Sequence, residues 1–451
     1  MSGLRLVVVA VVLSAAIAGV QTQETFNKQE FAARRAKLLD QIGDGIAVVI
    51  GGDEPGAAPV KFRQLPTFYY LTGIEEPNAV AIFNGVTRRT YIFAPKKSEN
   101  EIRFEGPGIL DTQNSRDFYG VTDVLPLDQI TAMLALPLPP DAKRLYLQMN
   151  LEDNLQQSRF EVKAGEVRRT AHPLYRNVSA MRMMLDNVRR QVPQLQVADL
   201  GPIMDKLRWI KSPYEIERMR KAGSIGAESV KEAIKGTHAG QYEYEVEATA
   251  RYIATKAGAG MGFTPIVASG PNTMAMHYEA NTRRMQAGDV VLLDFGADYD
   301  YYVSDVTRTW PVGGRFSAEQ EKMYACILAA RNAIIGMMKP GVTIQQMKNT
   351  ALQIYKRHGF EREFEESGRY VGHYVGMSVH DVSPGPDAPL QAGTTYNVEP
   401  MLTLEVSKIH MRLEDSVLVT ERGPENLTKD APTELEEIYA LIRQKGLAQA
   451  P

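Results

Sequence analysis

Two pairs of strand-like segments in the C-terminal half constrain the fold most, because each pair carries acidic residues at matching positions. Val290–Leu293 is an apolar run that ends at Asp294, and a second strand is predicted from Tyr301 to Trp310. If the turn between them is centred on Tyr299–Asp300, Asp294 lies directly opposite Asp305, and the two Cβ atoms are about 4.5–5.5 Å apart. The sequence therefore predicts a hairpin with two carboxylates on one face.

A second hairpin of the same construction is predicted further along the chain. Its strands are 396–399 and 410–414, and a turn near Val406–Ser407 places Glu399 opposite Glu414. The two hairpins together present four carboxylates. A bulge in either hairpin would break the pairing.

Carboxylates held this close together need a compensating charge, because burying a bare pair is costly or keeps one member protonated. Arg412 is predicted on the same face as Glu414, two residues away, where it orients or partly neutralises that carboxylate. A divalent cation between the carboxylates removes the conflict. The alternatives are that the acids line a solvated sheet face or bind one Ca²⁺ that only stabilises the fold.

Histidines supply a further candidate ligand. The chain has seven, and His277, His373 and His380 lie near the acidic segments. A lone histidine is more often a core or surface residue, but four nearby carboxylates favour a metal site. Four carboxylates and one imidazole are too many for a tetrahedral zinc and suit two cations with bridging carboxylates. Oxygen-rich coordination favours Mn²⁺, with Co²⁺ or Zn²⁺ as alternatives, and the predicted chemistry is metal-assisted hydrolysis of an amide.

The chain divides into two parts by its pattern of elements. Helix-like and strand-like segments alternate to about residue 190, which predicts an α/β domain. The Pro-rich segment Leu136–Pro140 is expected to be a connection. Prolines then punctuate 192–213, and Ser212 is predicted to cap a helix from Pro213 to about Gly236. Further helices are predicted over Tyr242–Ala257 and Ser317–Met338.

The N-terminus carries the one compositional extreme. Arg5 precedes an uncharged apolar run of fifteen residues, Leu6–Val20, which is shorter than the roughly 20 residues that span a bilayer. Ala16–Ala18 supplies a small-x-small cleavage pattern, so residues 1–20 are interpreted as a secretory signal and the mature protein as secreted or periplasmic, without a membrane span. An uncleaved anchor or a buried N-terminal helix is the alternative.

The net charge and the cysteine content argue against a nucleic-acid-binding protein and against a fold held by disulfides. The net charge of −3 argues against a nucleic-acid partner. The single cysteine, Cys326, permits no intramolecular disulfide, so the core rests on burial alone. Cys326 itself lies in an apolar helical segment and is predicted to be a core residue.

Several motifs, in order along the chain, resemble those of the pita-bread metallopeptidases, in the Xaa-Pro aminopeptidase and prolidase branch. They are Leu293–Gly296, Ser304–Thr309, Gly372–Gly376, Val379–Asp381, Val398–Pro400 and Arg412–Asp415. Upstream, Phe62–Gln64 and Phe68–Pro77 are similar to the creatinase-like domain that precedes the catalytic domain in this branch, and Ile210–Ile216 resembles the junction. The resemblance implies an α/β creatinase-like N-terminal domain over 24–195 and an α+β pita-bread catalytic domain over 199–445.

The resemblance also implies roles for individual residues. Asp294 would bind one metal, His373 and Glu399 the other, and Asp305 and Glu414 would bridge both. Among the catalytic residues, His277 and His380 would contact the substrate or the tetrahedral intermediate, Glu399 would assist proton transfer, and Arg412 matches a family arginine beside the bridging glutamate.

The activity implied is that of an aminopeptidase that releases the residue before a proline, in an enzyme that is commonly a homo-oligomer. Its rivals are a prolidase restricted to Xaa-Pro dipeptides and a non-catalytic peptide-binding module on the same fold. The motif Tyr70–Gly73 favours the aminopeptidase. Arg369 departs from the pattern, since many relatives carry a histidine four residues before the ligand His373.

Overall fold

A computed structural model describes residues 26–54, 61–135, 142–149, 153–174, 180–191, 193, 195–385 and 387–447. The expected signal at residues 1–20 and the expected connection Leu136–Pro140 lie outside the described residues. Within these ranges, every helix is too short or too polar to cross a bilayer.

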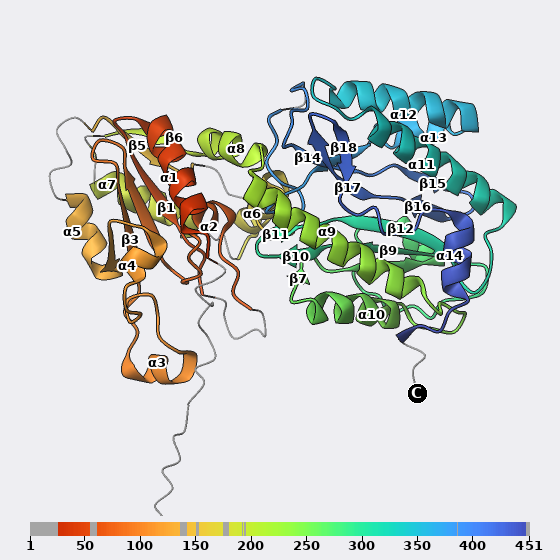
Figure 1. Ribbon diagram of the computed structural model, residues 1–451, viewed down its shortest axis with the longest axis horizontal. Coiled ribbons are helices and arrows are strands. Elements are labelled where there is room, and N and C mark those ends of the chain that lie inside the picture. The colour runs from red at the N-terminus through yellow and green to blue at the C-terminus, as the bar shows by residue number, and fades with distance from the viewer. Residues whose placement is uncertain are drawn as a thin grey trace, which may run out of the picture.

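The N-terminal part is built on a mixed sheet in the strand order β4-β3-β2-β1-β5-β6 (Figure 1). The strands are β1 (Ile46–Ile50), β2 (Val80–Asn84), β3 (Arg89–Ala94), β4 (Asp123–Pro126), β5 (Arg144–Leu147) and β6 (Gln196–Asp199). The helices are α1 (Lys28–Ile42), α2 (Pro66–Thr72), α3 (Glu99–Glu105), α4 (Ser115–Tyr119), α5 (Ile130–Ala135), α6 (Arg159–Ala171), α7 (Ala180–Gln191) and α8 (Gly201–Trp209), with a short 3₁₀ helix at Leu127–Gln129.

Alternation along β1 explains why helices cover both faces of this sheet. Ala47 and Val49 pack into the cluster that holds α1 and α2, whereas Ile46 and Val48 pack into the cluster that holds α7. The N-terminal part is therefore the α/β domain that the sequence predicts.

The C-terminal part places its strands between α10 on one side and α11 with α12 on the other (Figure 1). Its helices are α9 (Pro213–Ile234), α10 (Glu243–Lys256), α11 (Ala318–Met337), α12 (Ile344–His358), α13 (Glu361–Glu366) and α14 (Leu435–Ile442), with a 3₁₀ helix at Gly270–Met274. Its strands are β7 (Gly260–Met261), β8 (Ile266–Ser269), β9 (Val290–Phe295), β10 (Ala297–Tyr299), β11 (Tyr302–Val303), β12 (Val306–Pro311), β13 (Gly372–Tyr374), β14 (Thr395–Val398), β15 (Met401–Leu404), β16 (Ile409–Arg412), β17 (Asp415–Thr420) and β18 (Gly423–Asn426).

Four small sheets form the inside of this part: β11-β10-β7, β12-β9-β8, β13-β14-β17-β18 and β15-β16. Trp310, Tyr324 and Tyr355 fill the core between these strands and the helices. Cys326 is buried there, as predicted, and burial raises the pKa of its thiol to about 12, which makes it unreactive.

The junction between the two parts begins α9 where the sequence predicts it. The Ser212 side chain accepts from the Glu215 backbone N–H, the Glu215 carboxylate accepts from the Ser212 backbone N–H, and Pro213 occupies the first turn. The other predicted helices correspond to α10 and α11, with ends within one or two residues.

The register predicted for the first hairpin is wrong by two residues, because the turn lies one position further along the chain. Asp294 pairs with Thr307 in the β9–β12 ladder, so Asp305 lies diagonally from Asp294 and not opposite it. The turn falls on Asp300 and Tyr301, both with positive φ (50° and 70°), because Tyr299 pairs with Tyr302. Because side chains alternate between the two faces of a strand, a register shift of an even number of residues keeps Asp294 and Asp305 on the same face of the hairpin.

The N-terminal domain holds Tyr301 in this unusual conformation. Its ring stacks on Tyr69 of α2, with ring centroids 3.4 Å apart, and its hydroxyl accepts from the Gln64 backbone N–H at 3.0 Å. The sequence around the hairpin carries no sign of this long-range contact.

The second predicted register is correct. Met401 pairs with Arg412 on one side, and Val398 pairs with Asp415 on the other. The two ladders share one register, so Glu399 and Glu414 stand opposite each other in the short gap between them.

Candidate metal centre

The predicted ligands come from both halves of the C-terminal part and converge on one buried site. Asp294 lies in β9 and Asp305 immediately before β12, while His373 lies in β13. Glu399 follows β14, and Glu414 lies between β16 and β17. All four carboxylates are less than a tenth exposed.

Three of these residues form a tight cluster. Asp305, His373 and Glu414 each offer one ligand atom, and these atoms all lie within 4.8 Å of one another. The His373 Nε2 atom is 3.5 Å from Asp305 Oδ2, 3.5 Å from Glu414 Oε1 and 3.8 Å from Glu399 Oε2. A single cation could therefore contact several of these groups after small side-chain adjustments.

Hydrogen bonds outside the cluster orient the ligands. His373 Nδ1 lies 3.1 Å from the Tyr374 carbonyl oxygen, which can only accept, so Nδ1 carries a proton and Nε2 faces the carboxylates. The Thr307 hydroxyl donates to Glu414 Oε2 at 2.7 Å, and Asn397 Nδ2 donates to Glu414 Oε1 at 3.0 Å. These hydrogen bonds fix the orientation of His373 and Glu414 so that their free atoms can coordinate a cation.

At the glycines on both sides of His373 there is no room for a side chain. Gly372 has φ 131°, and a Cβ there would lie 1.8 Å from the Asn397 carbonyl oxygen. A Cβ on Gly376 would lie 1.9 Å from Asp381 Oδ2. The motif needs glycine at both positions because the backbone passes so close to its neighbours.

Without a cation the carboxylates are electrostatically frustrated. Burial, followed by repulsion from Glu414, raises the pKa of Glu399 to about 8, and the same two causes raise the pKa of Asp305 well above its usual value. Burial also raises the pKa of Asp294. Glu414 differs: burial opposes its ionisation, but the hydrogen bond from His373 and the charge of Arg412 lower its pKa.

Two buried carboxylate oxygens are suited to coordinate a cation. Asp294 Oδ1 and Asp305 Oδ1 have no hydrogen-bond partner among the described residues, although both are shielded from water. Such atoms are costly unless something coordinates them. Four carboxylates and Arg412 carry a charge of −3, so one divalent cation would leave −1 and two would leave +1. The donor set of oxygens with one imidazole fits divalent cations.

Arg412 has different partners from the predicted one. Its Nη2 donates to Asp294 Oδ2 at 2.7 Å and its Nη1 donates to Glu399 Oε1 at 3.1 Å. We expected it to orient or partly neutralise Glu414. Its charge does lower the pKa of Glu414, but its hydrogen bonds go to the other two carboxylates. The guanidinium instead reaches across to the other hairpin and joins the two pairs of carboxylates.

The two other predicted histidines line the same cavity. His277 and His380 border a cavity of about 170 Å³ together with Asp294 and Asp305. The His380 ring makes an edge contact with His373, with ring centroids 4.4 Å apart. Arg369 instead lies at the end of α13, where it pairs with Glu365 at 2.5 Å, and it does not line the described part of this cavity.

Sequence reasoning missed two carboxylates that line the cavity, Glu161 of α6 and Glu279. The Glu161 Oε2 atom lies 3.0 Å from His380 Nδ1. The pattern Ser158-x-x-Glu161 is a visible capping box. It marks a helix start, but it does not reveal that Glu161 also reaches into the other domain.

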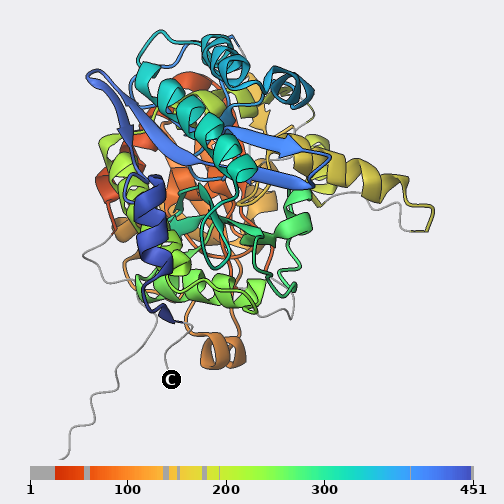
Figure 2. The ribbon, with the colours of Figure 1, turned by 90° about the vertical axis from the view of Figure 1, so that its right-hand side faces the viewer.

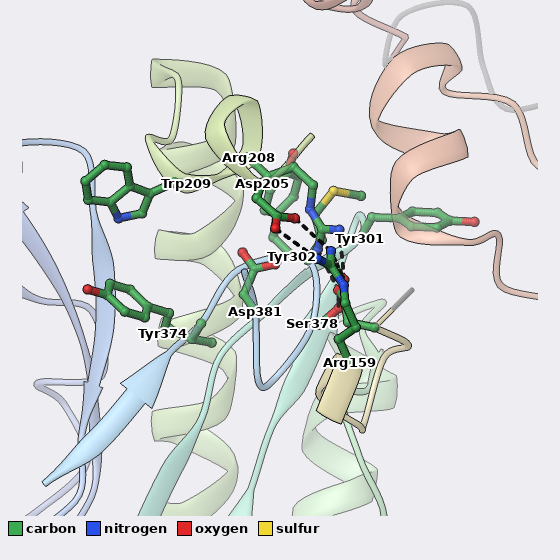
Figure 3. Close-up of polar contacts among 12 residues, drawn as sticks. Arg159, Asp205, Arg208, Trp209, Tyr301, Tyr302, Tyr374, Ser378 and Asp381 are labelled. Atoms are coloured by element: carbon green, nitrogen blue, oxygen red, sulfur yellow. Dashed lines mark hydrogen bonds and ion pairs between the residues drawn. The ribbon is translucent and has the colours of Figure 1, made fainter. Parts of the chain in front are cut away.

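A buried ion network includes Asp381, the residue after His380 (Figure 3). Arg208 of α8 bonds to Asp381 at 2.5 Å and to Asp153 at 2.7 Å, and Lys211 bonds to Asp381 at 3.0 Å. Burial alone would raise the pKa of Asp381, but Lys211 and Arg208 lower it. The network joins the domain junction to the loop that follows His380.

The fold and the site define a metal-dependent hydrolase with a buried, carboxylate-rich centre. The chain belongs to the metallopeptidase family M24: residues 217–421 match that family, and residues 31–146 match the aminopeptidase P N-terminal domain. It is therefore a metallo-exopeptidase of the pita-bread Xaa-Pro aminopeptidase family, as the resemblance implied.

Three relatives illustrate the similarity. The chain is 30% identical to the mitochondrial intermediate cleaving peptidase 55 of Arabidopsis thaliana, over 92% of this chain and 83% of that protein. It is 28% identical to the Xaa-Pro aminopeptidase of Haemophilus influenzae, over 92% and 97%. A solved structure of a putative aminopeptidase P from Bacillus anthracis matches with a TM-score of 0.81 and 29% identity, over 94% of this chain and all of that one.

Proposed function

We propose that this protein is an exported aminopeptidase with two divalent cations, which releases the N-terminal residue from peptides with proline in the second position. The observation that carries the proposal is the convergence of four buried carboxylates and His373 beside a cavity. Within the described ranges, two of the carboxylate oxygens have no hydrogen-bond partner. Mn²⁺ is the favoured cation, with Co²⁺ or Zn²⁺ as alternatives.

The residues have distinct tasks in this proposal. Asp294, Asp305, His373, Glu399 and Glu414 would hold the cations, which supply Lewis acidity and activate water when bound. Arg412 keeps Asp294 and Glu399 in place through its two hydrogen bonds.

Proton transfer and substrate contact fall to other atoms. Since Arg412 engages Glu399 Oε1, Oε2 is the atom that accepts a proton from water and returns it to the leaving amine nitrogen. His277 and His380, which border the cavity, contact the substrate.

An apolar wall of the cavity supports the proline preference. Phe263 and Val379 line the cavity and pack together with Val303 in a small buried cluster. A flat apolar surface suits the pyrrolidine ring, which offers no N–H for a hydrogen bond. The names of the relatives support the same preference.

A groove beside the cavity supports an aminopeptidase over a dipeptidase. A second hollow of about 550 Å³ shares Gln156, Phe263 and Thr264 with the cavity. It extends between Arg63 of the N-terminal domain and Arg251 of α10. A peptide longer than two residues could continue along this groove beyond the proline.

Assays of purified enzyme with Xaa-Pro, Xaa-Pro-Yaa and Xaa-Ala-Yaa peptides test the substrate. We expect cleavage of Xaa-Pro-Yaa after the first residue and little cleavage of Xaa-Ala-Yaa. Cleavage of the dipeptide alone would identify a prolidase. Retention of the cellular function by an Asp294→Asn variant would instead indicate a non-catalytic peptide-binding module.

Export and assembly are part of the proposal. The N-terminal sequence of the protein from its own host should begin shortly after the cleavage pattern at Ala16–Ala18. An intact Met1 would refute export. A homo-oligomer is supported by α6, which buries no side chain within the chain and leaves Phe160 80% and Val167 58% exposed. Sedimentation of the purified protein as a monomer would refute it.

A further inference from the structure

His380 Nδ1 forms a hydrogen bond of 3.0 Å with Glu161 Oε2 of α6, in the N-terminal domain, and the chemistry of the two groups decides which of them donates. Glu161 Oε2 also accepts from the Ser158 backbone N–H at 2.7 Å and lies 2.7 Å from the Ser158 hydroxyl. The hydrogen bond with His380 is the main cause that lowers the pKa of Glu161, to about 2. An ionised carboxylate can only accept, so the proton of this bond belongs to His380 Nδ1.

The opposite ring nitrogen is then free for the substrate. In a neutral ring with the proton on Nδ1, Nε2 presents a lone pair. The ring itself borders the cavity, so Glu161 would determine which nitrogen is protonated and how the ring is held.

Polar contacts at its first turn join the helix that carries Glu161 to α8 and to His380. No side chain of α6 is buried, and the helix stands away from the body of the molecule (Figure 2). Arg159 forms two hydrogen bonds with Asp205 of α8, at 2.9 and 2.7 Å (Figure 3). Arg208, on the same helix α8, bonds to Asp381, the residue after His380.

These contacts form a closed structural loop. One route joins His380 to α6 through Glu161, and the other joins Asp381 to α8 through Arg208 and then to α6 through Asp205 and Arg159. Two adjacent residues of the catalytic domain are thus held from two directions. This arrangement restrains the ring more strongly than one hydrogen bond at a free helix end would.

We propose that Glu161 is a positioning residue, which fixes the tautomer and orientation of His380 from the N-terminal domain. The inference rests on the proposed function, because it assigns Glu161 a part in that reaction. It adds a role for the N-terminal domain of the same chain in assembling the catalytic site.

A double-mutant cycle tests whether Glu161 acts through His380. We expect Glu161→Ala to lower kcat on an Xaa-Pro-Yaa peptide by about 10- to 100-fold, with KM changing much less. In a His380→Ala background the same substitution should have no further effect. An equal loss in both backgrounds would overturn the proposal, because Glu161 would then act independently of His380.

Two further variants separate orientation from folding. Glu161→Gln keeps an acceptor for Nδ1–H and should retain more of kcat than Glu161→Ala; equal losses would contradict the hydrogen bond as the cause. Glu166→Ala is the matched control on the same helix, since Glu166 Oε1 makes no hydrogen bond to any residue that the structure describes. It should leave kcat unchanged, and a loss like that of Glu161→Ala would indicate a general effect on α6.

A spectroscopic measurement distinguishes failure of this inference from failure of the proposed function. The ¹⁵N signals of His380 in the zinc-loaded protein, assigned with His380→Ala, should report the tautomer with the proton on Nδ1, and Glu161→Ala should reduce its population. A tautomer unchanged by Glu161→Ala would refute the inference even in an active enzyme. Loss of activity on Xaa-Pro peptides with the expected tautomer would refute only the substrate assignment.

Discussion

Replacing Arg412 should destabilise the cation-free protein strongly and the cation-loaded protein much less. Arg412 is 3% exposed and holds carboxylates from both hairpins through hydrogen bonds of 2.7 and 3.1 Å. Removing one partner of a buried ion pair costs about 3–5 kcal/mol. A domain of this size melts lower by about 2–4 °C for each kcal/mol, so Arg412→Met should lower Tm by roughly 6–20 °C after chelation.

Bound cations should offset much of this loss, because they neutralise the same carboxylates. Melting curves of Arg412→Met with excess Mn²⁺ and with chelator give the comparison. Arg315→Met is the matched control: its pair with Glu436 is exposed on both sides, so it should cost less than about 1 kcal/mol. Equal shifts for both variants, or an Arg412→Met shift unaffected by Mn²⁺, would refute the electrostatic role assigned to Arg412.

Two other predictions concern pH and packing. The pKa values of Asp294, Asp305 and Glu399 are raised in the cation-free folded state, that of Glu399 to about 8. The folded state therefore binds more protons than the unfolded state. Its stability should fall as pH rises from about 5 to about 8. The Tm difference between Mn²⁺-loaded and chelated protein should widen over that range; a constant or narrowing difference would contradict the frustrated site. Gly376→Ala would place a Cβ 1.9 Å from Asp381 Oδ2, whereas Gly314→Ala meets nothing within 4 Å. Only the first should lower both Tm and kcat, and equal behaviour of the two variants in both measurements would contradict the close packing behind His373.

The sequence predicts the site well where local pattern decides the structure. Opposed strands and a two-residue side-chain period put Glu399 and Glu414 together, and the ladders on both sides of them share the predicted register. The capping box at Ser212 likewise sets the start of α9 within its own first turn. Each of these outcomes depends on residues a few positions apart.

Long-range contacts explain what the sequence could not predict. The turn at Asp300 and Tyr301 depends on Tyr69, more than two hundred residues earlier, which stacks on Tyr301. Arg412 turns towards Asp294 because the two hairpins face each other across the site. Glu161 reaches His380 from the other domain, and no local spacing announces that contact.

The number of cations bound at the carboxylate cluster tests the central claim most directly. Purified protein that has been stripped and reloaded with Mn²⁺ should contain about two ions per chain by elemental analysis, and activity on an Xaa-Pro-Yaa peptide should rise with loading. An Asp305→Asn variant, with one oxygen of the cluster in Asp305, His373 and Glu414 replaced, should bind fewer ions and lose that activity. Less than one ion per chain, with no gain in activity on adding Mn²⁺, Co²⁺ or Zn²⁺, would contradict the proposal of a hydrolytic centre with two cations.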